Sequence, residues 1–71
     1  MIKKNIPESP EALVHSRHMM GLTQKQMAEA LHIGISAVSR MENGRRPIEY
    51  RTALAVQYLL TEYMQGTLKI S

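Results

Sequence analysis

The sequence predicts an all-α fold, with four helices in one small domain. Its 71 residues leave no room for a second domain. Residues typical of helix starts alternate along the chain with glycines typical of helix ends. Between these points the apolar side chains recur at helical spacing, and no internal repeat is present.

The first helix is expected from Pro10 to about Met20. Ser9 can cap it, and proline fits the first helical position because its missing N–H group has no partner there. Residues 1–8 contain two lysines and a proline without a helical period, and we expect a flexible arm. The folded domain then covers residues 9–65. The tail, residues 66–71, is expected to be either a short strand or disordered.

Two short helices are expected next. Thr23 and Gln26 form the capping-box pattern that starts a helix at Gln24–Leu31. After a tight break of three residues, a third helix is expected at Ile35–Glu42. The pair at 43–44, Asn-Gly, tolerates left-handed backbone and ends it.

The two short helices and the turn between them have the form of a helix-turn-helix. The inner face of the first carries Met27, Ala28 and Leu31, and that of the second carries Val38 and Met41. The outer face of the second is small, polar and basic, as a helix entering a major groove must be. We expect that face to consist of Ile35, Ser36, Ala37, Ser39 and Arg40.

The last helix is expected from Ile48 to about Met64, after a loop at 45–47 and before Gly66. A helical wheel predicts that one face of this helix packs on the core, made of Ile48, Ala53, Ala55, Val56, Leu59, Leu60, Tyr63 and Met64. A second row consists of Tyr50, Leu54 and Tyr58. This row either covers the edge of the core or meets a second copy of the chain. We favour a homodimer through it, helped by the tail.

Positive charge is concentrated in one part of the chain. The formal net charge is +3, and four of the five arginines, Arg40, Arg45, Arg46 and Arg51, lie between residues 38 and 51. Arginine suits bidentate contact with a phosphate or a base edge. The charge therefore favours an acidic partner, although a solvated basic face would have the same composition.

The sequence lacks the residues that several classes of function require. The chain has no cysteine, so it has no disulfide framework, thiolate site or thiol nucleophile. His15 and His18 could share a helix face, but no third metal ligand is evident, and the serines have no His–Asp partners. We expect no cofactor, metal or catalysis. No apolar run approaches a membrane span and no secretory signal is evident, so a cytoplasmic, nucleoid-associated protein is expected.

A longer pattern combines these features. Gly21-Leu22-Thr23-Gln24 leads into the first short helix, Ser39-Arg40-Met41-Glu42-Asn43-Gly44 ends the second, and Arg46-Pro47 follows. The pattern resembles the phage Cro and lambda-type repressor family of helix-turn-helix proteins, also called XRE-type, over about residues 10–60. The resemblance implies a compact four- to five-helix bundle that binds double-stranded operator DNA, usually as a symmetric dimer.

The resemblance also implies roles for individual residues. Base edges would be met by Ile35, Ser36, Ser39 and Arg40. The phosphate backbone would be held by Gln24, Lys25, Asn43, Arg45 and Arg46. Arg17 and Glu42 would form an internal ion pair. The sequence departs from the pattern at His32, which stands where the turn usually has glycine, and in the apolar side chains of Ile35 and Ala37.

The function expected from the sequence is therefore a dimeric repressor or autorepressor that binds a palindromic operator. Small regulators of this type are similar to phage Cro-like proteins, to antitoxins and to regulators encoded beside anti-CRISPR genes. The alternative is a protein-binding module, such as an antitoxin that holds a toxin or another regulator, built on the same fold.

Overall fold

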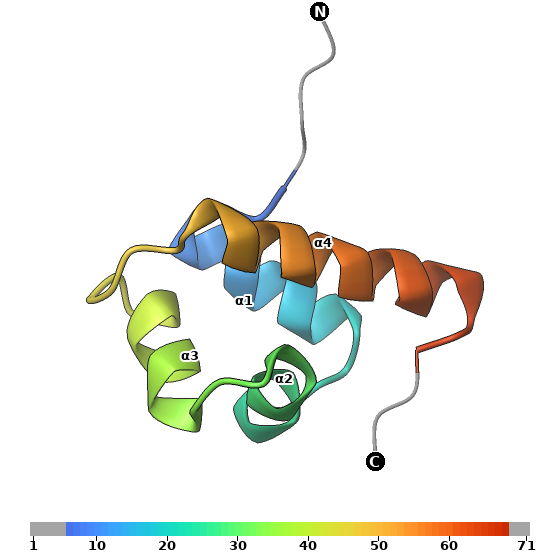
Figure 1. The fold of residues 1–71 in the computed structure, drawn as a ribbon, viewed down its shortest axis with the longest axis horizontal. Helices are drawn as coiled ribbons and strands as arrows, with labels where there is room; N and C mark the ends of the chain where they lie inside the picture. The colour runs from blue at the N-terminus through green and yellow to red at the C-terminus, as the bar shows by residue number, and fades with distance from the viewer. Residues whose placement is uncertain (1–5, 69–71) are drawn as a thin grey trace, which may run out of the picture.

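The computed structural model describes residues 6–68, and within this range it contains four α-helices and no strand (Figure 1). The first and last helices are packed together, and the two short helices lie below them. The all-α fold predicted from the sequence is confirmed. Residues 1–5 of the predicted arm and 69–71 of the predicted tail lie outside the described residues, whereas Pro7 is buried and Leu68 packs against the core. The helices are α1 (Pro10–Met19), α2 (Gln24–Leu31), α3 (Ile35–Glu42) and α4 (Tyr50–Gln65).

The first two helices begin at capping side chains. The Ser9 hydroxyl accepts a hydrogen bond from the backbone N–H of Ala12 at 3.1 Å. At α2 the capping box is complete: the Thr23 hydroxyl accepts from the N–H of Gln26 at 3.1 Å, and the Gln26 side chain accepts from the N–H of Thr23 at 2.9 Å. These bonds satisfy donors that have no partner inside a helix, so they define where each helix starts.

All four helices end in the same backbone motif. A residue with positive φ follows the last turn, and the next N–H group donates to a carbonyl five residues earlier, as in the Schellman motif. At the end of α3, for example, Gly44 has φ +72° and the N–H of Arg45 donates to the carbonyl of Arg40 at 2.8 Å. The left-handed positions are Gly21, His32, Gly44 and Gly66.

His32 is the one non-glycine residue among these four positions, with φ +58°. A side chain in left-handed backbone is strained, whereas glycine is not. Replacing His32 with Gly is expected to raise the free energy of unfolding by about 0.5–1 kcal/mol, because relief of strain exceeds the added entropy of the unfolded chain.

Urea denaturation measures this change, with Glu29→Gly inside α2 as the control. The control is expected to lower stability by about 1 kcal/mol, since glycine is a poor residue in a helix interior. If His32→Gly were as destabilising as the control, the turn would not be strained.

The core lies where the four helices meet. Leu13 of α1, Met27 of α2, Val38 of α3 and Val56 of α4 are completely buried. The inner face of α3 is wider than predicted, because α3 packs against α1 as well as α2. Ala37 is therefore buried, with 8% exposed, and its assignment to the outer face was wrong.

The predicted core stripe of α4 was also partly wrong. Ala53, Val56 and Leu59 are buried as expected, but Ala55 is exposed, and Tyr63 and Met64 are exposed by 44% and 76%. With 16 residues α4 is the longest helix, and its last turn extends past the helices beneath it (Figure 1). Ile48 packs on the core from the loop, because α4 starts at Tyr50 rather than at Ile48.

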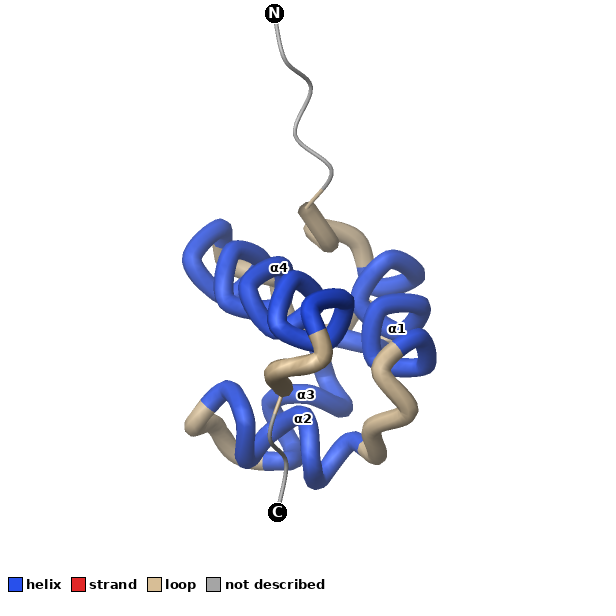
Figure 2. The backbone as a smooth tube through the Cα atoms, turned by 90° about the vertical axis from the view of Figure 1, so that its right-hand side faces the viewer, coloured by secondary structure: helices blue, strands red, loops and turns tan. Residues whose placement is uncertain are grey.

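The arrangement separates two surfaces. The α2–α3 pair forms one side of the bundle, and α4 lies across the other side (Figure 2). A residue on the outer face of α3 and a residue on the outer face of α4 can therefore contact different partners at the same time.

Candidate nucleic-acid interface

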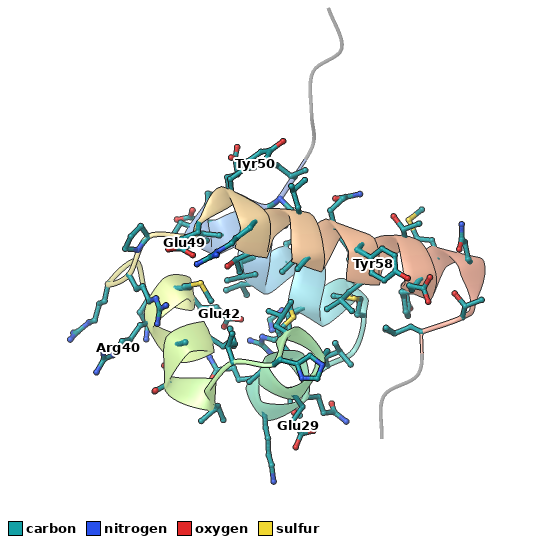
Figure 3. All side chains as sticks on the ribbon, in the orientation of Figure 1. Glu29, Arg40, Glu42, Glu49, Tyr50 and Tyr58 are labelled. Carbon is teal, nitrogen blue, oxygen red and sulfur yellow. The ribbon has the colours of Figure 1, made fainter. Side chains whose placement is uncertain are left out.

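The outer face of α3 is formed by a few short side chains and one arginine. Ile35 is half exposed, Ser36 and Arg40 are exposed, and Ser39 is partly buried. The Asn43 side-chain amide donates to the Ser39 hydroxyl at 3.4 Å. Arg40 extends outward from this helix (Figure 3). Short side chains allow the backbone of α3 to approach a base-pair edge closely, and Arg40 can reach further.

The loop after α3 adds two exposed arginines, Arg45 and Arg46. The hydrogen bond from the N–H of Arg45 to the carbonyl of Arg40 folds this loop back against the end of the helix. Arg45 and Arg46, predicted to meet phosphates, therefore follow directly on the helix that carries Arg40, whereas Lys25 stands on α2.

At the start of α2, Gln24 makes a contact that the sequence did not predict. The amide nitrogen of its side chain donates to Glu42 Oε1 at 3.0 Å, so this side chain is engaged inside the protein. Lys25 is exposed. The backbone N–H groups of Gln24 and Lys25 belong to the first turn of α2 and have no acceptor within the helix. Together with the helix dipole, such groups attract phosphate.

A buried cluster joins the first three helices. Arg17 of α1 donates from Nε to Glu42 Oε2 at 2.7 Å and from Nη2 to Glu42 Oε1 at 3.0 Å. Its Nη1 donates to the carbonyl of Leu22 at 3.0 Å. The Arg17 and Glu42 side chains are only 13% and 5% exposed. With Gln24 as the third side chain, this Arg17–Glu42–Gln24 cluster fixes the end of α3 against the start of α2.

Sequence reasoning did not find that Gln24 belongs to the cluster, nor that Arg17 bonds the Leu22 carbonyl. Both contacts depend on how α1, α2 and α3 pack, and no local pattern encodes them. The one sequence feature consistent with a Gln24–Glu42 contact is that Gln24 is the first residue of α2 and Glu42 the last residue of α3.

The cluster affects the pKa of Glu42. Burial alone would raise this pKa, but hydrogen bonds from Arg17 and Gln24, the charge of Arg17 and the charge of His18 together lower it. A carboxylate with a lowered pKa in the folded state stabilises the fold above its unfolded pKa. That stabilisation is lost as the pH falls through the folded pKa.

We therefore expect acid to weaken the fold through Glu42. Between pH 7 and pH 3 the wild type should lose more stability than Glu42→Gln, because glutamine does not titrate and an unperturbed glutamate has a pKa of about 4.3. Urea denaturation of both proteins across this range measures the difference. Parallel curves would show that Glu42 contributes nothing to the pH dependence.

The row Tyr50, Leu54 and Tyr58 lies elsewhere. The three side chains are exposed by 45%, 43% and 63% on α4, and the structure does not bring them to the α3 surface. Figure 3 shows Tyr50 at the start of α4 and Tyr58 further along the same helix, both away from Arg40.

Residues 6–68 contain no group of three His, Cys, Asp or Glu side chains that could hold a metal ion. No helix in that range is long and apolar enough to cross a bilayer.

Comparison with known proteins identifies the family. A protein-family model described as helix-turn-helix matches residues 17–56, from the arginine of the buried cluster to the middle of α4. No curated protein and no solved structure matches the chain. The matched segment contains α2, α3 and the loop with Arg45 and Arg46, and it covers more than half of the chain. The protein therefore belongs to the XRE-type helix-turn-helix family of DNA-binding regulators.

Proposed function

We propose that this protein is a dimeric transcriptional repressor that binds a palindromic operator with α3 in the major groove. One observation carries the proposal: α3 presents short side chains and one arginine outward, beside two more exposed arginines, while the Arg17–Glu42–Gln24 cluster holds the helix in place. A rigid helix of this kind can read base edges, and the neighbouring cations supply affinity.

The proposed base contacts follow from side-chain chemistry. Arg40 can donate two hydrogen bonds to guanine O6 and N7, which is the commonest specific contact in the major groove. Ile35 can pack against a thymine methyl group, and Ser36 and Ser39 can bond to either kind of base edge. Because only Arg40 is long, part of the sequence preference would come from DNA shape.

The proposed phosphate contacts surround α3. Arg45, Arg46 and Asn43 would hold the backbone on one side, and Lys25 with the N-terminus of α2 would hold it on the other. We assign the phosphate contact of Gln24 to its backbone N–H group, since its side-chain amide donates to Glu42.

The dimer would form through Tyr50, Leu54 and Tyr58 of α4. Two copies related by a two-fold axis would place their α3 helices on half-sites about 34 Å apart. We propose that the protein acts in the cytoplasm and is controlled by its own concentration, as in autorepression.

Selection of binding sites from a random DNA duplex pool at about 150 mM salt tests the proposal. The expected result is an enriched inverted repeat with half-sites one helical turn apart. Weak binding that salt removes, with no enriched sequence, would contradict it.

The second candidate function is protein binding, as in an antitoxin that contacts a toxin. The observation in its favour is the exposed apolar row on α4, which DNA binding through α3 does not use. A protein partner on this row would compete with the proposed dimer but not with contact between α3 and DNA, because α3 and the row are on different sides of the bundle (Figure 2).

A further inference from the structure

The exposed side of α4 has an unusual composition. At about 100° per residue, the side of α4 turned away from buried Ala53, Val56 and Leu59 is uncharged except along one edge, where Arg51 and Glu62 lie. Thr61 and Gln65 occupy the end of this face. The remainder is the row Tyr50, Leu54 and Tyr58, at spacing i, i+4 and i+8.

The order of side chains in this row is symmetric about Leu54, because a tyrosine lies four residues before it and another lies four residues after it. In a two-fold interface, residue i of one copy meets residue j of the other, and j meets i in turn. We propose that two copies pair through antiparallel α4 helices with the two-fold axis at Leu54, so that Tyr50 of each copy lies against the partner's Tyr58. The inference rests on the proposed dimer and specifies its register.

Helix packing distances set the spacing of Cα atoms in this register. The two rows face each other across the two-fold axis, and the axes of packed helices lie about 8–10 Å apart. Since Cα atoms lie about 2.3 Å from a helix axis, the two Leu54 Cα atoms at the crossing point would be about 3.4–5.4 Å apart. The two Tyr58 Cα atoms would be about 12 Å apart along the helices.

Charge also favours a second copy as the occupant. Each copy has a net charge of +3, and Arg40 of α3 lies away from Tyr50 and Tyr58 (Figure 3). Beside the row, Arg51 is paired with Glu49 of its own chain at 3.1 Å. Pairing through α4 therefore brings two neutral faces together and keeps the basic surfaces apart. A highly charged partner would gain no ion pair from the row itself.

The size of the row indicates a weak dimer. From Tyr50 to Tyr58 the row is about 12 Å long. A standard interface buries about 800 Å² on each partner, and a single short row supplies less. We expect monomers and dimers to exchange at micromolar concentrations, with an operator favouring the dimer because both copies contact it.

Disulfide formation tests the register, and the chain has no cysteine of its own to interfere. Leu54→Cys is expected to oxidise to a covalent dimer, since a disulfide needs Cα atoms about 4.4–6.8 Å apart. Tyr58→Cys alone should form a covalent dimer at least about tenfold more slowly, because its two copies are too far apart. A mixture of Tyr50→Cys and Tyr58→Cys should form the mixed dimer. Tyr63→Cys, a tyrosine of similar exposure outside the row, is the matched control.

The outcomes separate the register from the dimer itself. If Tyr58→Cys or Tyr63→Cys oxidises faster than Leu54→Cys while wild-type protein sediments as a dimer, the register is wrong and the dimer stands. If wild-type protein sediments as a monomer at about 100 μM and binds its selected DNA as a monomer, both the register and the proposed dimer are wrong. Neither result would contradict the proposal that α3 binds DNA.

Discussion

Replacing Glu42 with alanine is expected to lower the free energy of unfolding by about 2–4 kcal/mol. The change removes the carboxylate that accepts from Arg17 and Gln24 and leaves the Arg17 guanidinium, with 13% of its side chain exposed, without its charged partner. A domain of this size has a stability of only about 5 kcal/mol, so most of it would be lost. Urea denaturation followed by circular dichroism gives the value.

Two variants control for this result. Glu29→Ala removes an exposed glutamate from α2 and should change stability by less than about 0.5 kcal/mol. Glu42→Gln keeps the shape of the side chain and should lie between the wild type and Glu42→Ala. The explanation fails if Glu42→Ala is no more destabilising than Glu29→Ala.

Replacing Arg40 with alanine is expected to weaken binding to the selected operator by about 1–3 kcal/mol, roughly tenfold to a hundredfold, and to relax the preference at one base pair of each half-site. Arg40 is exposed, so the fold should be unchanged. Fluorescence anisotropy on the operator and on variants of each base pair measures affinity and preference together.

Arg46→Ala is the matched comparison, since Arg46 is also an exposed arginine and lies in the loop that follows α3. It should weaken binding to all sequences about equally and reduce the salt dependence of log K by about one. The assignment of α3 as the reading helix is wrong if Arg40→Ala also weakens all sequences equally.

The sequence predicted the helix-turn-helix best. The bounds of α2 and α3 were predicted correctly, because a capping box starts the first and left-handed residues end both. These features act within a few residues, so they can be seen before the chain is folded.

Features that depend on packing were predicted less well. Ala37 was placed outside because the contact of α1 with α3 is not encoded locally. Tyr63 and Met64 were predicted to be buried because a helical wheel does not show where a long helix extends past the helices it packs against. The bond that the Gln24 amide donates to Glu42, 18 residues further along the chain, was not predicted, and the phosphate contact of Gln24 stays a prediction.

Whether Arg40 reads a guanine can be tested atom by atom. Each guanine of the selected operator would be replaced in turn by 7-deazaguanine, which lacks the N7 acceptor, and binding of wild-type protein and Arg40→Ala would be compared. We expect one guanine in each half-site at which the replacement weakens the wild type and leaves Arg40→Ala unchanged, since a bidentate contact needs both acceptors. Equal losses for both proteins at every guanine would contradict base reading by Arg40 of α3.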